Sequence, residues 1–109
     1  MIKPLELIVT KHASDRLNDM WRFPSPPSLP LDEEVRLFKY RRTDTKEIVW
    51  MCQIDGGFLV GEMRHTKRRQ MLVAMTAINR DMVQKHRYAR LACHRVVVDK
   101  ITFQGAGHQ

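Results

Sequence analysis

Residues 67–92 read KRRQMLVAMTAINRDMVQKHRYARLA, and the element that this stretch forms decides the fold. Its central part is rich in Met, Ala, Leu and Gln, which lose little side-chain entropy in a helix, and it contains no Gly or Pro. The pattern predicts one long helix from Lys67 to Ala92. At about 100° per residue its apolar side chains fall in one sector that would pack on a sheet; these are Met71, Met75, Ile78, Met82 and Ala89.

The remaining elements are predicted from apolar spacing and turn residues. Branched and alternating residues predict strands, and apolar residues three to four apart predict a short helix near the N-terminus. Asp55-Gly56-Gly57 marks a tight hairpin, because Gly tolerates the positive φ that such turns need. The predicted order is strand 5–11, helix 12–21, strands 34–42, 47–54 and 58–65, the long helix, and a last strand over 95–103.

This order predicts an α+β fold. We expect a mainly antiparallel sheet of four or five strands with one short and one long helix, in the order β-α-β-β-β-α-β. The 109 residues are predicted to form a single domain, 1–109, because 43% of them are hydrophobic and 28% charged, as in an ordinary globular domain. A proline-rich segment over 23–30 is expected to connect the short helix to the next strand.

Membrane, metal and cofactor sites are not expected. The chain contains no apolar stretch near the roughly 20 residues that span a bilayer, and no secretory signal, so a cytoplasmic protein is predicted. Cys52 and Cys93 belong to no C-x-x-C pair, and the histidines are scattered, so the sequence predicts neither a metal ion nor another cofactor.

The positive charge of the chain is concentrated between Arg64 and Arg95. This segment holds nine Lys/Arg and a single acid, Asp81, which gives +8, whereas the other 77 residues hold ten Lys/Arg and eleven Asp/Glu, which gives −1. The formal charge of +7 therefore comes entirely from one segment. A basic surface of this kind attracts polyanions through counterion release, so nucleic acid is the expected partner.

If the segment is a helix, its arginines form a line. Arg69, Arg80 and Arg87 then fall within about 20° of one another, opposite the methionines, and Arg68 and Arg90 flank them. A plain solvated helix face is the alternative interpretation, although such a face normally mixes charges of both signs. The sequence thus predicts an anion-binding helix face.

A second basic cluster lies on the predicted strand 34–42. It consists of Lys39, Tyr40, Arg41 and Arg42 and follows Phe38. Rings and guanidinium groups interleaved on a sheet suit single-stranded nucleic acid, because bases stack on the rings and phosphates pair with the cations. Tyr40 is the best stacking candidate, and a half-buried position in the sheet is the alternative for it.

The residues His12-Ala13-x-x-Arg16-Leu17 resemble the opening of small toxin domains of bacterial toxin–antitoxin systems, of the RelE and BrnT type. The resemblance implies a metal-independent ribonuclease. Such cleavage needs an acid and a base for proton transfer and cations for the developing phosphorane charge, and His12 and Arg16 would supply the first acid or base and one cation. The proline segment and the predicted long helix depart from these compact toxins.

Other basic residues would have to complete such a ribonuclease site, for instance Arg42, Arg64 and His65. The alternative for the N-terminal pair is structural. His12 then caps or packs the short helix, and Arg16 pairs with a neighbouring aspartate, Asp15 or Asp19.

We therefore expect a small basic nucleic-acid-binding protein, accessory or regulatory in role, of the kind that phages, plasmids or bacteria encode. Single-stranded DNA or RNA is favoured over duplex, because a helix packed on a sheet enters a major groove less readily than a protruding one. Two alternatives remain open: a ribonuclease toxin centred on His12 and Arg16, and an inhibitor or adaptor whose basic face binds an acidic protein partner.

Overall fold

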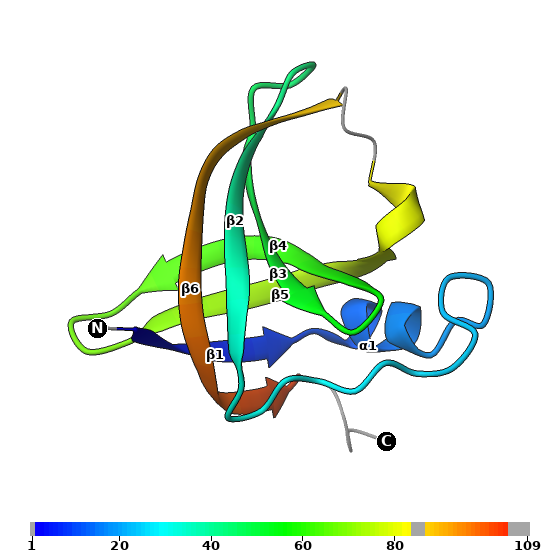
Figure 1. Ribbon diagram of the computed structural model, residues 1–109, viewed down its shortest axis with the longest axis horizontal. Helices are drawn as coiled ribbons and strands as arrows, with labels where there is room; N and C mark the ends of the chain where they lie inside the picture. Colours follow the sequence, from blue (N-terminus) through cyan, green and yellow to red (C-terminus); the bar gives the residue numbers. More distant parts are fainter. Residues whose placement is uncertain (1, 84–86, 105–109) are drawn as a thin grey trace.

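The computed structural model describes residues 2–83 and 87–104, in which six strands close into a barrel (Figure 1). The strand order around the barrel is β1-β5-β4-β3-β2-β6. Closure pairs every strand with a neighbour on each side, although the first half of β6 pairs with β2 alone. Along the chain the elements are β1 (Lys3–Val9), α1 (Lys11–Leu17), β2 (Glu34–Arg42), β3 (Ile48–Ile54), β4 (Gly57–His65), β5 (Gln70–Asn79), the 3-10 helix η1 (Arg80–Met82) and β6 (Tyr88–Phe103).

Strand β1 closes the barrel because it pairs in parallel with both β5 and β6. Leu5 lies opposite Gln70 of β5, and Lys3 lies opposite Val96 of β6. The other neighbouring strands pair antiparallel. The prediction of a mainly antiparallel sheet is therefore confirmed, but the sheet has six strands where four or five were expected.

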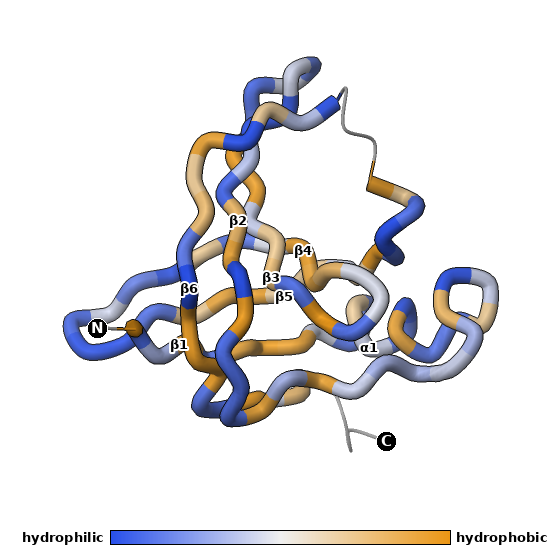
Figure 2. Tube along the Cα trace, viewed as in Figure 1, coloured by the Kyte–Doolittle hydropathy of each residue, from blue (hydrophilic) through white to orange (hydrophobic). Residues whose placement is uncertain are grey.

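The hydrophobic core fills the barrel interior. Successive side chains of a strand point to opposite faces, so alternate residues of every strand face inward. Figure 2 shows hydrophobic segments along the strands and hydrophilic residues gathered in the β2–β3 and β4–β5 turns. The inward residues with the least exposure are Leu5, Leu7, Val9, Leu37, Cys52, Leu59, Leu72, Ala74, Ala77 and Val98.

Helix α1 covers the end of the barrel at which β1 finishes. Thr10 caps the helix, since its side-chain oxygen accepts a hydrogen bond from the Ala13 N–H at 3.2 Å and its hydroxyl donates to the Ala74 carbonyl at 2.8 Å. Ala13 and Leu17 are buried against the barrel. The short predicted helix is thus confirmed, although it ends at Leu17, and the proline-rich residues 23–30 lie between it and β2.

The three strands β2, β3 and β4 form the antiparallel meander that the sequence predicts. β2 has the predicted bounds, and β3 and β4 each differ from the prediction by one residue at the start. Gly56 lies in the β3–β4 turn with a φ of 79°, the left-handed conformation expected there. Within the described residues, no helix has the length and apolar character needed to cross a membrane.

The predicted long helix over 67–92 is wrong, because its described residues form part of the β4–β5 turn, β5, η1 and the start of β6. β5 pairs with β4 along its length and with β1 over its first five residues, so strands on both sides satisfy the backbone groups of its first half. Leu72, Ala74 and Ala77 fill the barrel interior. The helix preference of Met and Ala is worth only about 0.7 kcal/mol per residue or less, so pairing and burial override it.

The methionine core stripe is wrong for the same reason. Met75 is 51% exposed and Met82 is 41% exposed. Met75 is the extra residue of a β-bulge, since Val60 lies opposite Thr76 while the next residue, Gly61, lies opposite Ala74. A Cβ at Gly61 would overlap the backbone carbonyl of β5, so this close approach requires glycine.

Candidate nucleic-acid interface

The structure separates the three arginines of the predicted line. Arg69 lies in the turn before β5, Arg80 begins η1 after β5, and Arg87 precedes β6. The ten residues of β5 place Arg69 and Arg80 roughly 30 Å apart along the strand. The predicted helical face of Arg69, Arg80 and Arg87 is therefore wrong, and each cation has to be considered in its own surroundings.

Two carboxylates hold Arg69. Its Nη2 donates a hydrogen bond to Asp99 Oδ1 at 2.8 Å, and its Nε lies 3.2 Å from Glu6 Oε1, close enough for an ion pair but not aligned for a hydrogen bond. Glu6 is 9% exposed and also accepts a hydrogen bond from the Thr102 hydroxyl. Arg69 thus ties the β4–β5 turn to β1 and β6, and we leave it out of the interface.

The second predicted cluster divides between the two faces of β2. Tyr40 and Arg42 point to one face, while Lys39 and Arg41 alternate to the other. Arg42 forms a two-pronged ion pair with Asp44, at 3.1 Å from Nε to Oδ1 and 2.8 Å from Nη2 to Oδ2. This guanidinium lowers the pKa of the Asp44 carboxyl, and the charge of Arg42 is compensated locally.

The other predicted cations have no carboxylate within ion-pair distance in the described part of the chain. These residues are Lys39, Arg41, Arg68, Arg80, Arg87 and Arg90. The ammonium of Lys39 lies 5.6 Å from the centre of the Trp50 ring. Among the six, Arg80 and Arg90 stand beside aromatic side chains in one pocket.

A row of four aromatic rings crosses β4, β2 and β6 on the face of the sheet that points away from the core. Neighbouring ring centres lie 5.9 Å apart in each contact: Phe58 with Phe38, Phe38 with Tyr40, and Tyr40 with Tyr88. Phe38 is buried, whereas the rings of Tyr40, Tyr88 and Phe58 are partly exposed. The row therefore offers partly exposed rings on both sides of one buried ring.

We call the space above these rings the aromatic pocket. Its volume is about 420 Å³, and it is lined by Tyr40, Phe58, Arg80, Val83, Tyr88 and Arg90. The first part of β6 and the β2–β3 hairpin rise above the rest of the barrel (Figure 1). β2 contributes Tyr40 to the pocket, β6 contributes Tyr88 and Arg90, and η1 contributes Arg80. The pocket combines three rings and two guanidinium groups, and none of the described residues that line it is acidic.

Tyr40 lies where the aromatic and the cationic parts of this pocket meet. Partial burial raises the pKa of its phenol, and the nearby positive charge of Arg90 acts in the opposite direction. Arg90 lies directly opposite Tyr40 in the β2–β6 pairing, so both side chains emerge on the same face. A planar base on Tyr40 would therefore have a cation beside it for the adjoining phosphate.

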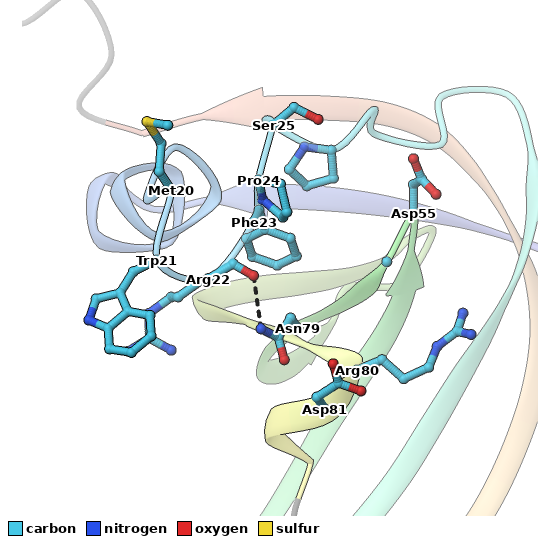
Figure 3. A pocket seen from close by; sticks show the side chains of 12 residues that line it. Met20, Trp21, Arg22, Phe23, Pro24, Ser25, Asp55, Asn79, Arg80 and Asp81 are labelled. Atoms are coloured by element: carbon cyan, nitrogen blue, oxygen red, sulfur yellow. Dashed lines mark hydrogen bonds between the residues drawn. The ribbon is translucent and has the colours of Figure 1, made fainter.

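Arg80 also borders a second pocket, which Figure 3 shows beside η1. Trp21 projects from the rim of this pocket and is 89% exposed. The connection after α1 is anchored there by a hydrogen bond from Asn79 Nδ2 to the Arg22 carbonyl at 2.8 Å. Asp55 and Asp81 line the pocket, so it suits phosphates less well than the aromatic pocket does.

The N-terminal pair His12 and Arg16 lies on α1, at the opposite end of β1 from His65 and the β4–β5 turn (Figure 1). Arg16 Nε donates to His12 Nε2 at 3.3 Å, and Arg16 Nη1 lies 3.7 Å from Asp19 Oδ2. The pairing with Asp19 is therefore present, and Thr10 rather than His12 caps the helix. His65 is not brought to this pair.

Tyr88 lines the aromatic pocket although the sequence pattern did not identify it as a site residue. The long-helix interpretation placed it on a helix, where a tyrosine two residues before Arg90 shares no face with it. In a strand, residues two apart do share a face, so the Tyr88-Ala89-Arg90 alternation would have identified the pair.

Within the described residues, no group of three or more His, Cys, Asp or Glu side chains is placed to hold a metal ion. Comparisons with known protein families, with curated proteins and with solved structures found no match to this chain. The functional inference therefore depends on the chemistry of the pockets.

Proposed function

We propose that this protein binds single-stranded nucleic acid through the aromatic pocket. The observation that carries the proposal is the Tyr40–Tyr88 ring pair beside Arg80 and Arg90, in a pocket whose described lining residues include no acid. The rings can stack on bases, and the guanidinium groups can bind phosphates. Binding of a flexible single strand requires these two kinds of contact.

Base stacking supplies the first part of the affinity. Tyr40 and Tyr88 are partly exposed, and the buried ring of Phe38 packs beside Tyr40 on the same face of β2. A base stacked on such a ring contributes about 1–3 kcal/mol, whichever base it is. The pocket therefore favours binding with little sequence preference.

The arginines supply the second part. Arg80 and Arg90 are exposed and have no carboxylate partner within the described ranges, so their charge is available to a phosphate. Each phosphate that is neutralised releases a condensed cation, which makes affinity depend on salt. Arg68 and Arg87, also exposed, attract the strand at longer range.

Single strands fit this arrangement better than duplexes. In a duplex both faces of nearly every base are covered by the neighbouring bases, so a recessed ring cannot reach them, whereas an unpaired strand can turn a base toward the ring. The structure also presents no protruding helix of major-groove length within the described residues, because α1 has seven residues and packs on the barrel.

The test compares two double variants that remove the same charge. Arg80→Ala/Arg90→Ala removes both pocket cations, and Arg36→Ala/Lys100→Ala removes two exposed cations from other parts of β2 and β6. Binding of a fluorescent oligothymidylate and an oligouridylate is measured by anisotropy over a series of salt concentrations. The slope of log affinity against log salt should fall by about 1.4 in the pocket variant and by much less in the control.

Equal slopes in the two variants would remove the aromatic pocket from the mechanism. The oligouridylate samples are also run on a denaturing gel, which reports on the ribonuclease alternative. If the oligouridylate is cleaved, and the cleavage is lost in a folded His12→Ala variant, the main activity of the protein is catalysis rather than binding.

A further inference from the structure

The end of the barrel opposite α1 contains a cavity that we call the mouth cavity. β1 begins there, and the β4–β5 turn lies beside it, as Figure 1 shows at the side of the N-terminus. Its volume is about 460 Å³, within the range of roughly 300–1,000 Å³ in which small-molecule sites fall. Its polar lining includes Lys3, His65, Gln70, His94 and Arg95.

Basic side chains from three separate elements line this cavity. Lys3 comes from β1, His65 lies opposite Gln70 across the β4–β5 pair, and His94 and Arg95 come from β6. Among the described residues, no acidic side chain lines the cavity. Arg95 has an ion pair with Glu34 at 3.6 Å, so Lys3 and the two histidines are the basic lining groups without a carboxylate partner in the described part of the chain.

An aromatic stack lies in the same cavity. Trp50 is partly buried and packs against the core, and the His94 ring stacks on it at 6.1 Å between ring centres with 25° between the planes. Leu37 and Val96 provide apolar contact below. Flat apolar surface beside cations is the chemistry that recognises an aromatic base joined to a phosphate.

The mouth cavity and the aromatic pocket lie on opposite faces of the same strands. Lys39 pairs with Trp50, whereas the next residue of β2, Tyr40, pairs with Val49, and successive residues of a strand face opposite ways. A ligand in one site therefore leaves the other accessible, and the inference below does not depend on the proposed function.

We propose that the mouth cavity binds a nucleotide phosphate, either of a free nucleoside monophosphate or of a phosphorylated strand end. Lys3, His65 and His94 hold the phosphate, and the base lies against the Trp50–His94 stack. The β4–β5 turn beside the cavity carries two exposed cations, Lys67 and Arg68, and a third, Arg64, lies near the end of β4. Hydrogen bonds within the turn, from the Arg69 N–H to Thr66 Oγ1 and from the Thr66 N–H to the Arg69 carbonyl, keep it in place.

The experiment uses Trp50 as the reporter. The chain has two tryptophans, so the Trp21→Phe protein carries Trp50 alone. Its fluorescence is titrated with adenosine, with adenosine 5′-monophosphate and with inorganic phosphate, and calorimetry checks the same titrations. The monophosphate should bind at least about tenfold more tightly than the nucleoside, because charge-assisted contacts to the phosphate are added.

The variants locate the site. His65→Gln/His94→Gln should weaken monophosphate binding about tenfold or more, and Lys3→Gln, at the exposed start of β1, provides a second variant if the histidine pair disturbs folding. Arg80→Ala/Arg90→Ala should bind the monophosphate as well as the parent protein does. Equal affinity for nucleoside and monophosphate, or binding unaffected by both mouth variants, would overturn the proposal.

Two further arms identify the source of the phosphate. Short oligothymidylates with and without a 5′-phosphate are compared in the parent protein and in the His65→Gln/His94→Gln variant. If the parent protein prefers the phosphorylated strand and the variant does not, the cavity binds strand ends. If the monophosphate binds tightly but the parent protein shows no preference for the phosphorylated strand, the cavity binds free nucleotides. Loss of monophosphate binding in Arg80→Ala/Arg90→Ala instead would place the ligand in the aromatic pocket and overturn the proposal.

Discussion

Arg69 and Arg80 stand at the two ends of the same strand and belong to the same basic segment, yet their surroundings differ. Arg69 lies between Glu6 and Asp99, which come from β1 and β6. Arg80 borders the aromatic pocket and has no carboxylate within ion-pair distance in the described residues. One cation holds the barrel together, and the other is available to a ligand.

The difference shows that net charge does not measure available charge. The segment from Arg64 to Arg95 carries a formal +8, but strand pairing brings acids from elsewhere in the chain to Arg69, whereas Arg80 and Arg90 have no acidic partner among the described residues. A cation opposite a partly buried carboxylate contributes to stability, whereas an exposed cation beside rings contributes to binding.

The largest effect is expected for Arg69→Ala on stability. The change leaves the Glu6 carboxylate, which is 9% exposed, without its cation, and should lower the free energy of unfolding by about 2 kcal/mol. Urea unfolding followed by circular dichroism measures it. Arg80→Ala is the control and should change the unfolding free energy by less than about 0.5 kcal/mol. Similar losses in the two variants would contradict the division between a structural and an available arginine.

A smaller effect is expected for Tyr88→Leu on binding. Leucine keeps apolar volume in the pocket but offers no ring face, so affinity for a single-stranded oligonucleotide should fall by about 1 kcal/mol, at the lower end of the stacking range. Tyr88→Phe keeps the ring and should bind nearly as well as the parent protein. If phenylalanine and leucine weaken binding equally, the hydroxyl rather than stacking is responsible.

The smallest effect is expected in the reactivity of the two thiols. Burial raises the pKa of Cys52 to about 12, so its reactive thiolate is scarce at pH 8, while Cys93 is exposed and lies opposite Phe38 on the face of the aromatic row. Alkylation followed by mass spectrometry should modify Cys93 first.

A bound oligonucleotide should slow the alkylation of Cys93 a few-fold and leave Cys52 unchanged. The protection should be lost in Tyr40→Leu. Protection that persists in this variant would place the strand on another surface.

Local signals were sufficient for part of the fold. The meander of β2, β3 and β4 follows from alternating residues and from the turn at Gly56, all within about 30 residues of one another. The stacking candidate Tyr40 follows from the same strand pattern, because a residue's face depends only on its position in the strand.

The failure at β5 has a different cause. Its sequence is apolar on nearly every residue, and a strand covered on both faces and a buried helix produce similar patterns. Helix propensity then favoured the helix, although it is weak compared with pairing on both edges. The partner β1 lies far away in the sequence, near the N-terminus. The parallel pairing of β5 with β1 therefore cannot be predicted from a local sequence pattern.

The sequence by itself determined that the charge excess lies in one segment, that three strands form a meander, and that rings and basic residues alternate on β2. The tertiary structure alone decided which arginines are available, because ion pairs act over a few ångströms and their partners are distant in sequence. Barrel closure by β1 brings Glu6 and the Asp99 of β6 to Arg69. The antiparallel pairing of β2 with β6 brings Tyr88 and Arg90 to Tyr40. Strand β6 therefore supplies the acid that neutralises one cation and also part of the aromatic pocket.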